Sequence, residues 1–445
     1  MRVGGRRKPD LALLAFVAAL GLFVFLVGGL FATFGWQPYQ FFEDGFSAAR
    51  KYYNERRQVR PDLLEPVRYV GSGVTIHRDG AWPGLTAVQG LFPEGVELRL
   101  LDMSGNVVHR WRADFHAIWP EPHHVFPPDN VPADNLHYQT HGMAFLRDGS
   151  VVFNFDNLGT VKLDRCGAVL WTVDRATHHS VTANPDGSFW IPARVDVRRV
   201  SDKVRLEGAS TAELLESNGR YEDSLLLVGP DGDIRAEISV LDALFNGQFG
   251  PELFDVREFS VADPTHLNDI EVVTAELAAR IPGVEAGDLL VSLRQMHMLA
   301  ILDRQTGAIL WRHAGPWIRQ HDPDITAEGL IEVFNNGDGS LAVDGVIGSS
   351  IVTLDPATGA ARTAYPGPDQ AHFFTRIMGA HQRLPNGNRL ITESMSGRLL
   401  EVDVSGQVVW EFVDAYDETH AALIQSAIRY PQDYFEVEDW HCPAN

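Results

Sequence analysis

One stretch decides the fold. Residues 299–311 read Leu299-Ala-Ile-Leu-Asp-Arg-Gln-Thr-Gly-Ala-Ile-Leu-Trp311. An apolar run ends in Asp, a tight turn containing Gly follows, and a second apolar run closes on Trp. Because Asp opens turns and Gly accepts a positive φ, this order of residues predicts a β-hairpin.

The same pattern recurs along the chain. Further copies occupy residues 98–111, 161–171, 225–234, 351–359 and 400–410, which makes six in all. Units spaced about 50 to 70 residues apart are typical of a β-propeller whose blades each have four strands. The long helical patterns that a parallel α/β sheet needs between its strands do not occur. The sequence therefore predicts an all-β fold, a six-bladed β-propeller.

The N-terminus predicts a membrane anchor. Four basic residues within the first eight precede an uncharged run from Leu11 to Trp36. At 1.5 Å per residue, a helix over this run is long enough to cross a hydrocarbon core of about 30 Å. The run is longer than that of a signal peptide, and Gly28-Gly29 is followed by a poor cleavage site. The basic cluster places the N-terminus in the cytoplasm and the remainder outside it.

These features divide the chain into four segments. We expect a basic cytoplasmic segment at 1–10, a transmembrane helix at 11–36, a juxtamembrane stalk at 37–68 and the propeller at 69–445. Within the propeller, insertions at 195–221 and 241–261 lengthen two blades, and residues 274–280 form a short helix.

Composition excludes one class of partner. Lys and Arg total 37 against 59 Asp and Glu, a formal charge of −22. Nucleic-acid binding needs a basic face, so this balance argues against it.

The chain has two cysteines, Cys166 and Cys442, without a Cys-x-x-Cys motif. A disulfide in an oxidising compartment and two unrelated thiols both remain open.

Histidines keep phase with the repeat. Four positions lie roughly one strand length before a turn glycine, at the start of a blade's first strand: His141, His178-His179, His321 and His381. His266 takes the corresponding place before Gly287, with the helix at 274–280 inserted between. A single histidine at a strand edge is more often structural. Since first strands line the channel of a propeller, however, histidines in phase should converge at one end of its axis.

Arg294 belongs to the same stretch of sequence and narrows the chemistry. Zinc or iron would need a nearby carboxylate ligand, for which Asp269 or Asp322 could serve. The alternative is an anion site, in which a neutral imidazole is the nucleophile and the other charges neutralise an oxyanion. A guanidinium matches oxyanions and repels metal cations, so Arg294 favours the anion site. We expect no metal and no other cofactor.

Several motifs, in this order, resemble the bacterial arylsulfate sulfotransferases that use no nucleotide donor. They are Thr265-His-Leu-Asn-Asp-Ile, Val291-Ser-Leu-Arg, Gln320-His-Asp-Pro, Val333-Phe-Asn-Asn-Gly and the closing unit from Gly379. The resemblance covers most of the chain after about residue 90. It implies a six-bladed propeller with three histidines and an arginine in its channel. It also implies aryl sulfates and phenols as small-molecule substrates.

The resemblance also implies roles. His321 matches the nucleophile that is transiently sulfurylated, while His266 and Arg294 match residues that hold the sulfuryl oxygens. His266 is also our candidate for the acid that protonates the departing phenolate. His179, or its neighbour His178, matches the remaining catalytic histidine. The residues expected to bind substrate are His178, Asn268, His141 and His381.

Two other functions fit the sequence. One is a non-catalytic, membrane-anchored scaffold that docks partners through the insertion at 195–221. The other is a metal-dependent hydrolase or lyase that uses the same channel. The chain also departs from the family in reading Gln-Met-His after Arg294 and Asn335 where Asp is frequent.

Overall fold

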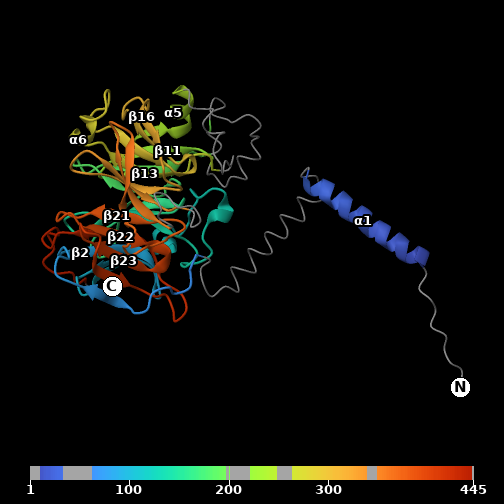
Figure 1. The fold of residues 1–445 in the computed structure, drawn as a ribbon, viewed down its shortest axis with the longest axis horizontal. Helices are drawn as coiled ribbons and strands as arrows, with labels where there is room; N and C mark the ends of the chain where they lie inside the picture. Colours follow the sequence, from blue (N-terminus) through green and yellow to red (C-terminus); the bar gives the residue numbers. More distant parts are fainter. Residues whose placement is uncertain are drawn as a thin grey trace, which may run out of the picture. The chain divides into compact units, whose positions relative to one another are not determined.

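The computed structural model describes residues 11–33, 63–196, 200, 221–247, 263–337 and 348–442. The chain forms two compact units, Met1–Pro61 and Asp62–Asn445. The first contains helix α1 (Leu11–Thr33) and the second contains every described strand (Figure 1).

Helix α1 coincides with most of the predicted transmembrane segment. Its side chains are described for residues 19–30. In the part of the chain that the structure describes, no helix has both the length and the apolar character needed to span a membrane. The predicted membrane span at 11–36 is therefore not supported. The segment at 1–10 and stalk residues 37–62 lie outside the described residues.

Six antiparallel sheets make up the second unit, which confirms the predicted six-bladed propeller. The first blade contains β25 (Leu423–Tyr430), β2 (Leu85–Phe92), β3 (Gly95–Leu101) and β4 (Val107–Arg112). The second contains β5 (Thr140–Phe145), β6 (Val151–Phe155), β7 (Gly159–Leu163) and β8 (Val169–Val173). The third contains β9 (Thr182–Ala183), β10 (Phe189–Arg194), β11 (Asp223–Val228) and β12 (Ile234–Ser239).

The last three blades follow the same order of strands. The fourth blade contains β13 (Leu267–Val272), β14 (Leu289–Leu293), β15 (Met298–Leu302) and β16 (Ile309–Ala314). The fifth contains β17 (His321–Ile325), β18 (Ile331–Asn335), β19 (Ser350–Asp355) and β20 (Ala360–Tyr365). The sixth contains β21 (Ala380–Arg383), β22 (Arg389–Glu393), β23 (Arg398–Val402), β24 (Val408–Val413) and β1 (Gly73–His77). Every hairpin predicted from the repeat forms the third and fourth strands of one blade, and in the last blade β1 adds a further strand outside it.

Few helices interrupt the described strands. The short ones are α3 (Phe115–Ile118), α5 (Val240–Asn246) and α6 (Ala275–Ala278), with 3₁₀ turns η1 (Pro128–Asn130), η4 (Arg294–Met296) and η5 (Ser394–Ser396). Helix α6 lies within the predicted helix at 274–280, and the Thr274 side chain caps it by accepting a hydrogen bond from the Leu277 N–H. Most of the insertion at 195–221 and residues 248–261 lie outside the described residues.

The tryptophan that closes a hairpin links its blade to the next. The indole N–H of Trp111 donates to the Asp164 carbonyl at 3.1 Å, and that of Trp171 donates to Pro230 at 2.8 Å. Trp410 of the last blade donates to Met103 of the first at 3.0 Å. Around these bonds the apolar faces of adjacent blades pack together, so the core lies between the sheets.

The first and the last strand of the propeller sequence both close the ring. The C-terminal strand β25 is the first strand of the blade that holds β2, and it pairs Tyr430 with Leu85. The N-terminal strand β1 adds a fifth strand to the last blade by pairing with β24. Figure 1 shows blue β2 beside the red C-terminal strands. A ring closed by strand pairing from both termini leaves no gap between its first and last blades.

The C-terminal tail is cross-linked to the second blade. Cys442 forms a disulfide with Cys166, in the turn between β7 and β8, with Cα atoms 5.6 Å apart. Nearby, the ring centroid of Trp440 lies 5.2 Å from the ring centroid of His109 and 5.7 Å from that of Trp111. Of the two alternatives that the sequence left open for the cysteines, the structure shows the disulfide.

This cross-link should stabilise the propeller measurably. It joins residues separated by 276 positions, so reducing it frees a long loop in the unfolded chain and should cost about 2–5 kcal/mol of unfolding free energy. Guanidinium unfolding with and without a thiol reductant measures the difference. A Cys166→Ser/Cys442→Ser variant is the control and should not respond to the reductant. An unchanged midpoint for the wild-type protein would contradict the prediction.

Candidate functional site

A cavity of about 420 Å³ lies where the first strands of the blades meet. Its wall includes residues from β5, β13, β17, β21 and β25, together with residues just before β9. The candidate residues in this wall are His141, His179, Asn268, His321 and His381. Histidines at the starts of separate first strands thus reach one cavity, as their phase in the repeat predicted.

β-Bulges shape this wall. In β17 the register shifts between His321 and Pro323, and the extra residue, Asp322, has φ +50°. In β5 the corresponding residue is Gly142, where a Cβ atom would lie only 2.1 Å from the His179 carbonyl oxygen. Successive side chains on a regular strand point to opposite faces, whereas a bulge lets both His321 and Asp322 line the cavity.

His321 has one fixed ring nitrogen. Its Nδ1 lies 2.7 Å from Asn336 Oδ1 and 3.0 Å from the Arg319 carbonyl oxygen. The Asn336 amide cannot turn over, because its Nδ2 donates to the carbonyl oxygens of Thr375 and Met378 at 3.0 and 2.6 Å. Both partners of Nδ1 are therefore acceptors. Nδ1 carries the hydrogen, and Nε2 carries the lone pair.

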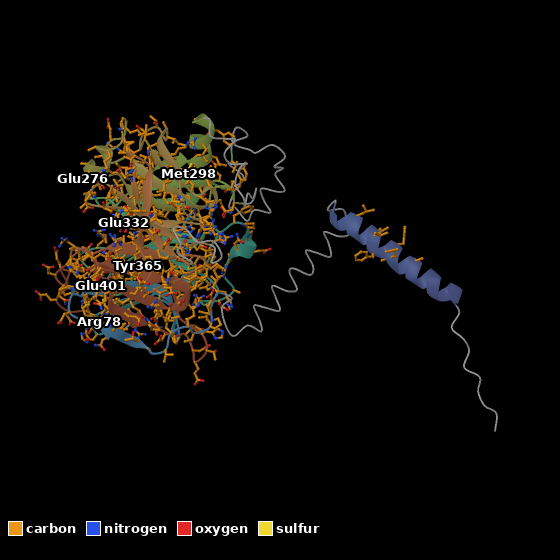
Figure 2. The ribbon with its side chains drawn as sticks, viewed as in Figure 1. Arg78, Glu276, Met298, Glu332, Tyr365 and Glu401 are labelled. Carbon is orange, nitrogen blue, oxygen red and sulfur yellow. A yellow bond between two sulfur atoms is a disulfide. The ribbon has the colours of Figure 1, made fainter. Side chains whose placement is uncertain are left out.

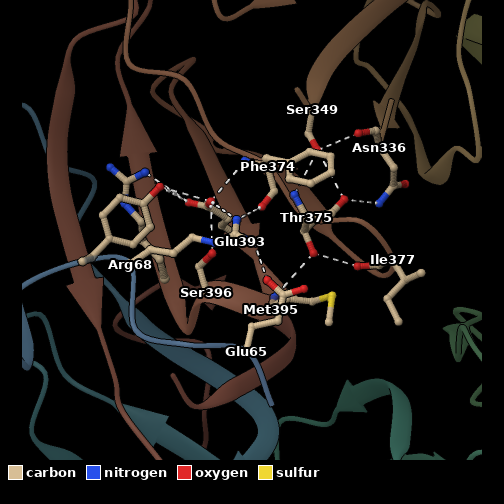
Figure 3. Close-up of polar contacts among 12 residues, drawn as sticks. Glu65, Arg68, Asn336, Ser349, Phe374, Thr375, Ile377, Glu393, Met395 and Ser396 are labelled. Carbon is tan, nitrogen blue, oxygen red and sulfur yellow. Dashed lines mark hydrogen bonds and ion pairs between the residues drawn. The ribbon is translucent and has the colours of Figure 1, made fainter. Parts of the chain in front are cut away.

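A polar network joins Asn336 to the segment that leads into the neighbouring blade. Ser349 Oγ donates to the Asn336 carbonyl oxygen at 2.9 Å and accepts from the Thr375 N–H at 3.1 Å (Figure 3). The Thr375 hydroxyl in turn donates to the Ile377 carbonyl oxygen at 2.7 Å. The orientation of His321 thus depends on contacts between the fifth and sixth blades.

The environment of His321 keeps its ring neutral. Burial and the nearby charge of Arg294 lower the pKa of His321 to about 3, outweighing the Asn336 hydrogen bond. A neutral imidazole with a lone pair on Nε2 is the form that acts as a nucleophile.

Arg294 and His266 are near enough to His321 for their charges to act on its ring, although neither belongs to the cavity wall itself. Arg294 begins η4, directly after β14, and its backbone N–H donates to the His266 carbonyl oxygen at 3.1 Å. His266 precedes β13 with φ +50°, and its Nδ1 lies 2.5 Å from Asp263 Oδ2. Its ring centroid is 5.2 Å from that of His179, which does line the cavity.

A buried chain of contacts fixes His179. Its Nδ1 is 2.8 Å from Nδ1 of His178, whose Nε2 lies 3.3 Å from Asp223 Oδ1. Because the carboxylate favours hydrogen on Nε2 of His178, Nδ1 of that ring is the acceptor and Nδ1 of His179 the donor. Burial, together with the charges of neighbouring histidines, holds the pKa of His179 well below its usual value. His179 thus also keeps its Nε2 lone pair.

His178 itself has no access to the cavity. Its side chain is fully buried, and it does not belong to the cavity wall. That His178 binds substrate stays a prediction; its ring contacts His179, which does line the cavity. Its contacts with Asp223 and His179 make it a positioning residue.

His141 and His381 have different surroundings. The His141 ring centroid lies 4.7 Å from that of His179, and His141 Nδ1 is 3.5 Å from Asp156 Oδ1. His381 Nδ1 lies 2.9 Å from Asp322 Oδ2, and its Nε2 is 3.7 Å from Asp324 Oδ2. Burial opposes protonation of His381, but the two carboxylates raise its pKa to about 9. His381 is thus an imidazolium that neutralises carboxylate charge.

Reading the sequence missed several residues that shape this site. They are Asn336, Asp263, Asp223 and the wall carboxylates Glu271 and Asp324, whereas Asp269 and Asp322 of the same wall had been considered as metal ligands. Only the wall carboxylates left a signal in the sequence, since they alternate with apolar residues along β13 and β17. Asn336, Asp263 and Asp223 act through contacts that no local pattern encodes.

Two groups of described residues have the spacing of metal ligands. In each, the donor atoms lie within 4.8 Å of one another: His141, Asp156 and His179, and Asp322, Asp324 and His381. In the second group the raised pKa of His381 keeps its ring protonated, and a metal ion would have to displace that proton. Neither group includes His266, Arg294 or His321.

Structural comparisons bear on the fold alone. A protein of unknown function from Bacteroides caccae has 13% sequence identity and a TM-score of 0.50, over 78% of this chain and 99% of that one. Virginiamycin B lyase from Staphylococcus aureus has 10% identity and a TM-score of 0.35, over 67% and 85%. TolB from Acinetobacter baumannii has 11% identity and a TM-score of 0.38, over 78% and 67%.

The family comparison is more specific. No curated protein matches the sequence at a significant level. The family model of the arylsulfotransferases (ASST) matches residues 142–415, which is more than half of the 445 residues and includes every candidate site residue except His141. The chain therefore belongs to the arylsulfotransferase family.

Proposed function

We propose that this arylsulfotransferase moves a sulfuryl group from a phenolic sulfate ester to a phenol through a sulfo-histidine at His321. One observation carries the proposal: His321 is a neutral imidazole at the cavity with its hydrogen held on Nδ1. The lone pair on Nε2 is then available to attack sulfur. The family match supports the reaction type.

The first step forms a bond from His321 Nε2 to sulfur and breaks the bond from sulfur to the phenolic oxygen. Arg294 and His266 neutralise charge on the sulfuryl oxygens, and His266 donates a proton to the departing phenolate. Asp263 Oδ2 lies 2.5 Å from Nδ1 of His266 and orients the ring so that Nε2 is the atom that exchanges the proton. The sulfurylated His321 ring keeps its Nδ1–H, which donates to Asn336 and to the Arg319 carbonyl oxygen.

The second step reverses these events with another phenol. His266, now neutral, takes the proton of the acceptor, and the phenolic oxygen attacks sulfur as the bond to Nε2 breaks. The product is a new aryl sulfate, and both histidines return to their starting forms. His179 lies beside His266 with a neutral ring and is assigned to hold the substrate.

We further propose that the propeller works outside the cytoplasm. The disulfide between Cys166 and Cys442 supports this location. Such bonds form and persist in oxidising compartments and are rare where glutathione keeps thiols reduced.

The full-length protein with p-nitrophenyl sulfate and phenol tests the proposed nucleophile. We expect His321→Ala to lower nitrophenol release by about 10³-fold or more, because the covalent route is lost. Without phenol, wild-type protein should gain the mass of one sulfo group on the peptide that contains His321. The exposed His123 provides the control, and His123→Ala should retain activity. Undiminished release by His321→Ala would overturn the mechanism.

A second prediction concerns the guanidinium. Replacing Arg294 by Gln removes the charge that neutralises the sulfuryl oxygens, so kcat/KM for p-nitrophenyl sulfate should fall by about 10²–10³-fold. Arg294→Lys should recover part of this loss because it restores charge without the planar geometry. The exposed Arg304 provides the matched control, Arg304→Gln. Equal rates for Arg294→Gln and wild type would exclude this role.

Asn336 gives a prediction about pH. In Asn336→Asp a carboxylate replaces the amide next to Nδ1 and favours the imidazolium, so the pKa of His321 should rise from about 3. Attack requires the neutral ring, and the acid limb of the kcat/KM profile should therefore move to higher pH. Asn386→Asp, at an exposed turn, is the control. Superimposable profiles for Asn336→Asp and wild type would show that Asn336 does not set the state of His321.

A further inference from the structure

Carboxylates crowd one part of the cavity wall. Asp269 and Glu271 come from β13, whereas Asp322 and Asp324 come from the neighbouring strand β17. All four line the cavity, close enough that the charges of Asp322 and Asp269 act on the other two. A cavity meant for a sulfate ester alone would have no use for this much negative charge, because it repels the anion.

Only part of this charge is neutralised. The His381 imidazolium lies against Asp322 and Asp324. Glu332, just behind them, is neutralised by Arg389 at 2.6 Å and Arg383 at 2.9 Å. In the part of the chain that the structure describes, no Arg, Lys or His forms an ion pair with Asp269 or Glu271. These two carboxyl groups face the cavity without a cation.

Protons compensate for the missing cation. Burial and the charge of Asp322 raise the pKa of Asp269 to about 8. Burial and the charges of Asp269 and Asp322 also hold the pKa of Glu271 well above its usual value. A bound cation would reverse this effect and let both groups ionise.

Asn268 supplies an independent observation. Its side chain is 5% exposed and belongs to the cavity wall. Its Nδ2 donates to the Gln320 carbonyl oxygen at 2.7 Å, which fixes the amide. Its Oδ1 has no hydrogen-bond partner among the described residues. A buried acceptor without a donor calls for a ligand that carries one.

We propose that Asn268, Asp269 and Glu271 bind an ammonium group on the substrate, so that the phenols this protein sulfurylates are phenolic amines. The proposal rests on the proposed function and adds the substrate class. An ammonium group donates three hydrogen bonds, one for each of these acceptors. Asp269 follows His266 by three residues, across the bulge in β13, and lines the cavity beside His321. A phenol ring with a short aminoalkyl side chain would place its hydroxyl at His321 and its ammonium group at these carboxyl groups.

A metal ion explains these residues less well. Among the described residues, neither Asp269 nor Glu271 belongs to a set of donor atoms with the spacing of metal ligands. The nearby set that has such spacing already contains the protonated His381. An alkylammonium group needs only hydrogen-bond acceptors, which these residues supply, and the cavity of about 420 Å³ has the size of a small-molecule site.

Matched acceptors test the proposal. Tyramine and tyrosol differ only in an ammonium group against a hydroxyl, and p-nitrophenyl sulfate serves as donor for both. With the full-length protein, we expect kcat/KM for tyramine to exceed that for tyrosol by about tenfold or more. In Glu271→Gln and Asp269→Asn this ratio should fall toward one. Glu276→Gln, on α6 at the margin of the propeller (Figure 2), should keep the wild-type ratio.

The outcomes separate the two proposals. Transfer to both acceptors at equal rates would overturn the substrate class and leave the sulfotransferase assignment intact. A preference for tyramine that EDTA abolishes would place a metal ion at the carboxylates and also overturn the proposal. If no phenol accepts sulfate, the proposed function fails. Calorimetric titration with tyramine and tyrosol still decides the ammonium site in that case, because equal affinities would overturn it.

Discussion

The hydrogen bond from His321 Nδ1 to Asn336 Oδ1 is the contact on which the proposed chemistry depends. It determines which ring nitrogen keeps a lone pair. Asn336 can accept it only because two carbonyl oxygens before β21 hold its amide from the other side. The nucleophile is therefore oriented by packing between two blades, and the rigid ring of sheets maintains that packing.

The fold could be predicted because its repeat is local. Each hairpin carries its own turn residues and its own apolar runs, such as Leu299 to Trp311, so the third and fourth strands of all six blades could be predicted from the sequence. Closure of the ring could not be predicted in this way, because the pairing of β25 with β2 joins segments from the beginning and the end of the propeller sequence. The disulfide is likewise non-local: neither cysteine carries a sign of its partner.

The candidate site could likewise be predicted only in part: the positions of its histidines could, but their electrostatic states could not. The phase of the repeat brought His141, His179 and His321 to one cavity, since strand position alone decides which end of the axis a residue faces. Their electrostatic states depend on tertiary neighbours. His178 and His179 are adjacent in sequence, yet only His179 reaches the cavity. Burial and the charge of Arg294 lower the pKa of His321 and keep it neutral, whereas neighbouring carboxylates outweigh burial and raise the pKa of His381.

Nitrogen NMR of the full-length protein labelled with ¹⁵N in its histidine rings tests the central claim most directly. At neutral pH the account predicts that His321 is a neutral ring with hydrogen on Nδ1 and a lone pair on Nε2. Adding an aryl sulfate without an acceptor should then shift the Nε2 resonance to that of a substituted nitrogen while the Nδ1–H remains. A protonated ring, or a neutral ring with its hydrogen on Nε2, would contradict the account.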